Sequence, residues 1–142
     1  MRFWLQSRVP QHPTGPCPCG SARGYAACCG ALHAGTRTAA TAQELMRSRY
    51  SAFVVADEAY LLATWHPSTR PPEVRFDDGL TWTGLTVLGT TGGSLLHTEG
   101  TVEFEARYVV QGQAGVLAEH SRFLRVDGNW LYLNAITPAT RR

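Results

Sequence analysis

The chain has 142 residues, of which 44% are hydrophobic and 17% charged, a balance typical of one globular domain and unlike that of a disordered protein. Residues 1–50 carry six arginines and one acid, a charge of +5, whereas residues 51–142 carry seven arginines and ten acids, a charge of −3. No apolar run approaches the roughly 20 residues that span a bilayer, and the N-terminus lacks the apolar core of a signal peptide. We therefore expect a cytoplasmic protein in a reducing compartment.

All four cysteines lie in one window, as Cys17, Cys19, Cys28 and Cys29. Two disulfides are one interpretation, although pairing adjacent cysteines is strained and a reducing compartment disfavours them. The other is a metal, because Zn²⁺ accepts four thiolates in a tetrahedron. The window therefore predicts a zinc ion held by all four cysteines, with an iron–sulfur centre as the alternative. Four sulfur ligands leave no open position, so the predicted role is structural.

Two helices are expected after residue 40. Thr41 and Glu44 form a capping pattern at the start of the first. Its apolar side gathers the following residues at helical spacing: Ala42, Leu45, Met46, Tyr50, Phe53 and Ala56. Arg49 is the exception, because it projects from within that apolar arc. A second, short helix is expected over residues 59–64, capped by Asp57 and ending before His66-Pro67.

Alternating β-forming residues then predict strands at residues 80–90, 100–110, 115–126 and 129–136. Asp127-Gly128 is a preferred two-residue hairpin turn, so it sets the register of the last pair. With that register Phe123 lies opposite Tyr132, Ser121 opposite Asn134, and Glu119 opposite Ile136. Helices followed by an antiparallel meander indicate an α+β fold.

Several segments resemble a known family. Residues 17–30, CPCGSARGYAACCG, resemble the SEC-C motif, and residues 45–53, 61–70 and 121–132 are similar to segments of the YchJ-like family. The resemblance implies a zinc knuckle in an N-terminal arm (residues 1–40) and a cone-shaped domain like nuclear transport factor two (residues 41–142), with helices packed on a curved antiparallel sheet. Ala22 stands where the motif usually has glycine. The resemblance implies no particular activity.

In a cone-shaped fold the sheet curls around a cavity, so the candidate ligand pocket lies on the face of the last hairpin. Its predicted lining combines a carboxylate, a hydroxyl and an amide with aromatic rings: Glu119, Ser121, Trp130, Tyr132 and Asn134. This lining would suit a polar ligand or general acid–base chemistry. His66 is expected at the mouth of the pocket, with Arg70 as an anion clamp. A structural interpretation stands beside each: His66 as a hydrogen-bonding residue, Arg70 as a solvated one, and Glu119 in a buried ion pair with Arg49.

These features favour a zinc-binding protein that acts as a protein-binding or adaptor module, with the N-terminal knuckle contacting the partner. The alternative is a small-molecule-binding protein or an enzyme that uses the cavity. Nucleic-acid binding is unfavoured, because four thiolates and one Zn²⁺ reduce the charge of residues 1–50 from +5 to +3. A homodimer through the aliphatic sheet face at Leu124, Leu131 and Leu133 is a further expectation.

Overall fold

The computed structural model describes residues 14–141, with side chains described through residue 136. Short helices come first and four long strands follow, which confirms the α+β class. The elements in chain order are η1 (Tyr25–Ala27), α2 (Cys29–His33), α3 (Ala42–Val54), α4 (Glu58–Ala63), β1 (Leu80–Gly92), β2 (Glu99–Val110), β3 (Gln113–Val126) and β4 (Asn129–Arg141).

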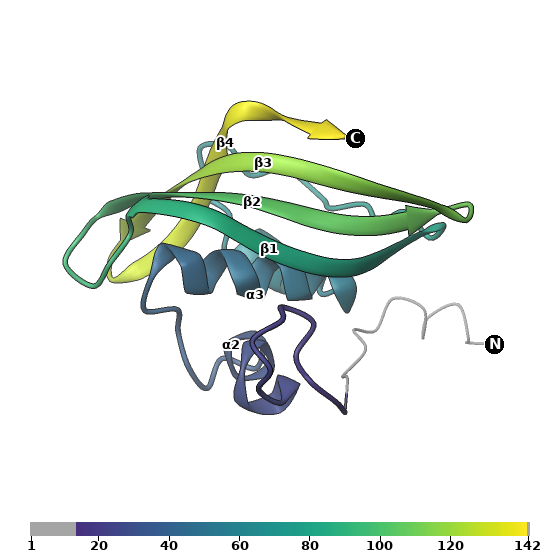
Figure 1. Cartoon of the computed structure of the whole chain (residues 1–142). Coiled ribbons are helices and arrows are strands. Elements are labelled where there is room, and N and C mark those ends of the chain that lie inside the picture. Colours follow the sequence, from purple (N-terminus) through teal and green to yellow (C-terminus); the bar gives the residue numbers. More distant parts are fainter. Residues whose placement is uncertain (1–13, 142) are drawn as a thin grey trace.

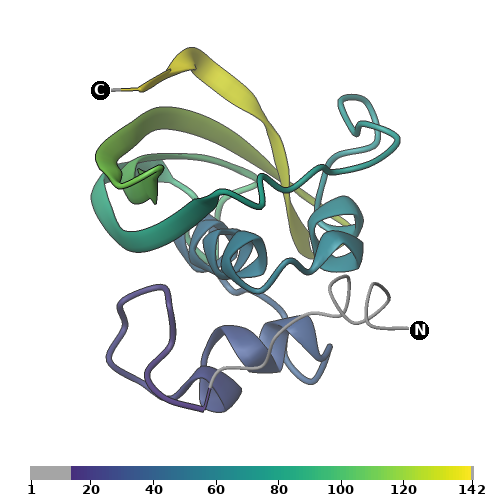
Figure 2. The same ribbon diagram turned by 90° about the vertical axis from the view of Figure 1, so that its right-hand side faces the viewer.

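The four strands form one antiparallel sheet in the order β1-β2-β3-β4, so each strand pairs with its neighbour in sequence. The sheet curves over α3 (Figure 1), and the segment that contains η1 and α2 lies on the other side of that helix. Figure 2 shows the same three layers from the side. The helix α3 is therefore the middle layer, with the sheet on one side and the cysteine segment on the other.

The helices begin where the capping residues predict. The Thr41 Oγ1 atom accepts a hydrogen bond from the Glu44 N–H at 3.1 Å. The Glu44 carboxylate accepts from the Ala40 N–H at 2.7 Å, one residue before the Thr41 N–H that a capping box would use. At α4, the Asp57 carboxylate accepts from the Tyr60 N–H at 3.1 Å. Each cap satisfies an N–H group that has no partner within its helix.

The predicted turn of the last hairpin is present. Asp127 and Gly128 have φ angles of 52° and 84°, the left-handed conformation that a two-residue hairpin turn requires. The predicted register is correct next to the turn, where Phe123 pairs with Tyr132.

Further from the turn the predicted register is wrong. A bulge follows the Phe123–Tyr132 pair, so Ser121 pairs with Ala135 instead of Asn134, and Asn134 pairs with Arg122. Because side chains alternate between the faces of a strand, one extra residue moves Asn134 to the outer face. The predicted pairing of Glu119 with Ile136 is lost for the same reason.

The main core lies between α3 and the sheet, where Leu45 and Met46 of α3 pack against Val102, Phe123 and Trp130. A second buried cluster, on the other side of α3, contains the four cysteines, Tyr25 and Val55. None of the helices in the described part of the chain has the length and apolarity needed to cross a membrane.

Candidate functional site

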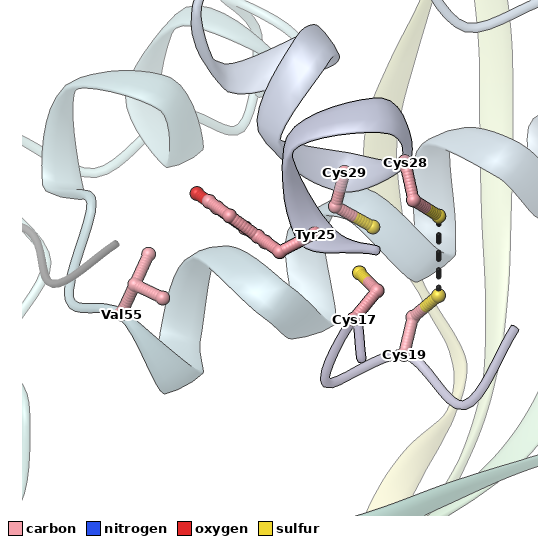
Figure 3. Packing of buried hydrophobic residues seen from close by; sticks show 6 residues of the cluster. All are labelled: Cys17, Cys19, Tyr25, Cys28, Cys29 and Val55. Atoms are coloured by element: carbon pink, nitrogen blue, oxygen red, sulfur yellow. Dashed lines mark hydrogen bonds between the residues drawn. The ribbon is translucent and has the colours of Figure 1, made fainter. Parts of the chain in front are cut away.

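The four cysteines converge on one buried point. Cys17 and Cys19 lie in the loop before η1, Cys28 separates η1 from α2, and Cys29 begins α2. Their exposed fractions lie between 0% and 5%, and all four sulfur atoms lie within 4.8 Å of one another. Figure 3 shows the sulfur atoms pointing toward one another. Side chains from two separate turns thus meet in a single four-sulfur cluster.

The sulfur geometry fits a metal. All four cysteines are free thiols, and the Cys19 and Cys28 Sγ atoms lie 3.7 Å apart. A disulfide requires about 2.05 Å. Metal–sulfur bonds of about 2.3 Å in a tetrahedron place the sulfur atoms roughly 3.8 Å apart. The cluster can therefore hold a metal ion with little rearrangement.

Without a cation, the cluster favours ionisation of Cys19 and opposes that of Cys17 and Cys29. Hydrogen bonding from the Cys17 and Cys29 thiols lowers the pKa of Cys19, because these bonds favour its thiolate. Hydrogen bonds with Cys17 and with Cys19, together with burial, raise the pKa of Cys29, and the hydrogen bond with Cys19 and burial raise the pKa of Cys17. A bound divalent cation reverses this opposition, since it stabilises all the thiolates together. The charge requirement of the cluster thus also fits a metal.

The backbone turns of the cysteine loop bring its two ends together. The Cys17 N–H donates to the Arg23 carbonyl at 2.7 Å, and the Gly20 N–H donates to the Cys17 carbonyl at 3.1 Å. Gly20 has a φ angle of 83°, and Ala22 has one of 71°. The loop therefore keeps a left-handed residue at position 22 although glycine is missing there.

Polar groups surround the sulfur atoms. The Ser21 Oγ atom lies 3.2 Å from the Cys28 Sγ atom, and the Arg23 guanidinium donates to the same sulfur at 3.9 Å. From α3, the Ser51 Oγ atom lies 3.6 Å from the Cys17 Sγ atom. Donors of this kind stabilise metal-bound thiolates and fix their orientation.

His33 joins the cysteine segment to α3. Its Nε2 atom lies 2.8 Å from the Ser48 carbonyl oxygen, and its Nδ1 atom lies 2.6 Å from the Tyr25 hydroxyl. A carbonyl oxygen only accepts, so Nε2 carries the hydrogen and Nδ1 accepts from Tyr25. His33 thus has a structural role in which both ring nitrogens are occupied.

A cavity of about 570 Å³ lies between α3, the sheet and the loop before β1. Its apolar lining is rich in aromatic rings, including those of Tyr50, Phe53, Phe76, Trp82, Phe104 and Phe123. Its polar lining includes three of the predicted pocket residues, Glu119, Ser121 and Tyr132, together with Arg49 and Trp65.

The other four predicted pocket residues are not among those that line the cavity. The His66 Nδ1 atom accepts from the Ser68 N–H at 3.1 Å. The exposed Arg70 guanidinium donates to the Trp65 carbonyl at 3.0 and 3.2 Å. His66 and Arg70 thus stabilise the loop in which they lie.

Trp130 and Asn134 do not line the cavity, for two different reasons. Trp130 is 2% exposed, packs in the main core, and donates from Nε1 to the Ala40 carbonyl at 3.2 Å. Asn134 is exposed opposite Arg122, where the bulge in β4 places it. Trp130 is therefore buried in the main core, and Asn134 lies on the outer face.

Arg49 lies at the wall of the cavity and is only 6% exposed. Its Nη1 atom donates to the Leu61 carbonyl at 2.8 Å and to the Thr64 hydroxyl at 2.7 Å. Its guanidinium carbon lies 4.9 Å from the Trp65 ring centroid and 4.7 Å from that of Tyr132. Burial lowers the pKa of Arg49 to about 10, so the group stays cationic at neutral pH.

Glu119 lies on the other side of Tyr132. Its Oε2 atom accepts from the Ser121 hydroxyl at 2.5 Å and from the Tyr132 hydroxyl at 3.2 Å. Burial and the nearby Glu119 carboxylate raise the pKa of Tyr132. Among the described side chains, Arg49 and Glu119 do not form the predicted direct ion pair. They interact at longer range, with the Tyr132 ring between them.

Sequence reasoning missed most of the aromatic wall. Trp65 directly follows α4, and Phe76 and Trp82 lie around the start of β1. In the sequence, the signal for this wall is the number of aromatic residues between Trp65 and Trp82. Their convergence depends on how the loop folds back against α3, which periodicity does not show.

Comparison with known proteins identifies both parts of the chain. Residues 41–135 match the family model described as YchJ, middle NTF2-like domain, and residues 16–31 match the SEC-C motif. The chain belongs to the YchJ-like family. This finding confirms the predicted resemblance and the fold it implied.

Its relatives include UPF0225 proteins. One from Streptomyces coelicolor is 56% identical over 84% of this chain and 94% of its own length. One from Xanthomonas campestris is 52% identical over 89% of this chain and 98% of its own length.

Two solved structures of SEC-C motif containing proteins are also similar. The one from Rhodopseudomonas palustris has a TM-score of 0.75 at 34% identity, covering 87% of this YchJ-like chain and 98% of that one. The one from Psychrobacter arcticus has a TM-score of 0.70 at 25% identity, covering 88% and 84% of the two chains.

Proposed function

We propose that the cysteine cluster holds one structural zinc ion and that the protein acts as a zinc-stabilised protein-binding module of the cytoplasm. The observation that carries the zinc assignment is the convergence of four buried sulfur atoms within 4.8 Å. Four thiolates complete a tetrahedral zinc site and leave no position for a substrate. A cluster of free thiols also suits a reducing compartment.

Native mass spectrometry with elemental analysis tests the zinc site. Protein purified from its own host should carry one zinc ion per chain, and Cys17→Ser or Cys28→Ser should lose it. Ser21→Ala is the matched control, because it removes a hydroxyl near Cys28 Sγ but no ligand. Recovery of iron with sulfide would overturn the choice of zinc, and metal-free protein with two disulfides would overturn the metal site.

A groove beside the cluster supports the binding role. It has a volume of about 310 Å³, and Cys28, Cys29 and one acid, Glu44, line it together with three arginines, Arg23, Arg37 and Arg47. Arg37 donates from Nη1 to the Glu44 carboxylate at 2.7 Å, whereas its buried Nη2 atom has no hydrogen-bond partner among the described residues. The three arginines would attract an acidic peptide segment, since guanidinium groups bind carboxylates well. We therefore propose an acidic segment of a partner protein as the occupant.

A hexaglutamate peptide serves as the probe of this groove. Isothermal titration of the zinc-loaded protein should detect binding that weakens with salt and that Arg37→Gln reduces at least about tenfold. Arg122→Gln is the control, because Arg122 is exposed on β3 and is not among the residues that line the groove. Equal loss of binding in both variants would show a general charge effect and refute the groove.

The aliphatic sheet face remains a proposed contact between two copies. Leu124, Leu131 and Leu133 are each partly exposed in β3 or β4. Light scattering that gives the mass of one chain at micromolar concentration would contradict this homodimer.

A further inference from the structure

We propose that the cavity between α3 and the sheet binds a neutral aromatic molecule that carries a carbonyl oxygen beside an N–H or O–H donor. A carboxamide on a fused ring has this chemistry. The proposal goes beyond the zinc site and the groove, since it concerns the other side of α3.

The walls of the cavity suit a flat aromatic body. Edge-to-face contacts join Phe53 to Phe76 and to Trp82, with ring centroids 6.0 and 6.4 Å apart. Tyr50 contacts Trp82 in the same way at 6.0 Å. The volume of about 570 Å³ lies in the range of pockets that enclose small ligands. A fused ring system can therefore stack against this wall while it fills only part of the space.

Arg49 can donate hydrogen bonds to an acceptor atom of the ligand. Both of its protein hydrogen bonds come from Nη1, and among the described residues its Nε and Nη2 atoms have no acceptor. The side chain is almost completely buried and lines the cavity. A buried cation with unused donors is stabilised when an oxygen atom accepts from it. A ligand carbonyl oxygen would provide that acceptor.

Trp65 lies in the same wall. Its Nε1 atom is buried and has no hydrogen-bond partner among the described residues. Its ring lies against Tyr132, with centroids 5.2 Å apart and planes at 87°. This indole N–H also offers a spectroscopic probe of the Arg49 side of the cavity.

Glu119 can accept a hydrogen bond from a donor group of the ligand. Its Oε2 atom accepts from both Ser121 and Tyr132, while its Oε1 atom accepts from no described residue. A carboxylate oxygen has lone pairs for a further hydrogen bond. An N–H or O–H group of the ligand would donate to this carboxylate, just as a carbonyl oxygen of the ligand would accept from Arg49.

The charges of the wall determine the charge of the ligand. Arg49 and Glu119 carry opposite charges on the two sides of Tyr132, and the other two charged lining residues, Arg75 and Asp77, are likewise of opposite sign. An anion would be attracted by Arg49 but repelled by Glu119, whereas a cation would be attracted by Glu119 but repelled by Arg49. Apolar walls strengthen both repulsions, because they lower the local dielectric constant. A neutral group with an acceptor and a donor satisfies both residues without repulsion.

Three probes with the same indole body test this inference in the zinc-loaded full chain at pH 7: indole-3-acetamide, indole-3-acetate and tryptamine. The neutral amide should bind at least about tenfold more tightly than the anion and the cation. In ¹⁵N spectra it should shift the Trp65 indole N–H. The Trp130 indole N–H should stay in place, because it donates to the Ala40 carbonyl outside the cavity.

Charge-neutralising variants make the selectivity falsifiable. Glu119→Gln keeps the size of the side chain and should bring the affinity for indole-3-acetate to within about threefold of that for the amide. Glu103→Gln is the control, because Glu103 is exposed on β2 and is not among the cavity-lining residues, and it should leave the selectivity unchanged. Equal affinity for all three probes, no binding of the amide below about 1 mM, or a shift at Trp130 without one at Trp65 would overturn the proposal.

Discussion

Ala22 lies in the cysteine loop with a φ angle of 71°, the left-handed conformation that alanine disfavours. That conformation costs a residue with a Cβ atom about 1–2 kcal/mol, and glycine avoids this cost. Glycine loses more backbone entropy on folding, by roughly 0.5–1 kcal/mol. The Ala22→Gly substitution should therefore stabilise the folded loop by about 0.5–1 kcal/mol. Because metal binding and loop folding are coupled, zinc affinity should rise about two- to fivefold.

A chelator competition assay measures this affinity directly. The matched control is Ala26→Gly, since Ala26 is equally exposed but lies in η1, where glycine brings only its entropic cost. Ala26→Gly should therefore weaken zinc binding, opposite to Ala22→Gly. If both substitutions weaken it by the same factor, the left-handed conformation at position 22 contributes nothing and the reasoning is wrong.

Two further substitutions test contacts of the same layer. Burial alone would raise the pKa of Glu44, but hydrogen bonds from Arg37 and a backbone N–H lower it below its usual value. Stabilisation by this carboxylate is complete above its unfolded pKa and is lost as the pH falls through the folded pKa. In urea titrations Glu44→Gln should thus cost about 0.5–1 kcal/mol at neutral pH and nothing at strongly acidic pH; a constant difference would contradict this. Gly30→Ala would place a Cβ atom 2.7 Å from the Tyr25 carbonyl oxygen and should lower the free energy of unfolding by about 1–3 kcal/mol. Gly24→Ala is the control, because its Cβ atom would meet nothing within 4 Å and should be tolerated. Equal thermal midpoints for the two variants would exclude the clash.

The local signals in the sequence predicted the elements well. Thr41 and Asp57 cap their helices, and Asp127-Gly128 forms the turn, because each acts on backbone groups within a few residues. The cysteine spacing likewise brought four sulfur atoms together, since both pairs lie within one short loop and helix. These predictions required no knowledge of how distant segments pack.

Predictions that depended on packing were less accurate. The turn fixed the register only as far as Phe123 and Tyr132, because the bulge beyond them has no glycine to indicate it. Asn134 consequently lies on the outer face. The sequence shows Arg49 as a charge within the apolar arc of its helix. Its actual partners, the end of α4 and two aromatic rings, depend on the angle between helices, which a pattern along one helix does not contain.

The opposite side of α3 also depends on packing between distant segments of the chain. This packing explains why the metal should affect the whole domain. Arg47, Ser48 and Ser51 form a polar stripe on the helix, yet both serines are fully buried. The Ser48 hydroxyl contacts the Tyr60 hydroxyl of α4, whereas the cysteine segment provides the other contacts. Arg47 donates to the Cys19 carbonyl at 2.7 Å, the Ser48 carbonyl accepts from His33, and the Ser51 hydroxyl lies near the Cys17 sulfur. The helix therefore relies on the cysteine segment to satisfy polar groups that the sheet cannot reach.

Removal of the metal should consequently loosen α3 before the sheet. Without a cation the clustered thiols cannot all ionise, and opening of their loop would expose the serine side of the helix to water. Amide hydrogen exchange after chelation should become at least about tenfold faster in α3, while β2 and β3 keep their protection through pairing on both edges. The solvent-exposed β3–β4 turn serves as the internal control, since its exchange should not change. Unchanged exchange in α3 would mean that the cysteine segment folds against the helix without the metal, and the cluster would then stabilise only its own loop.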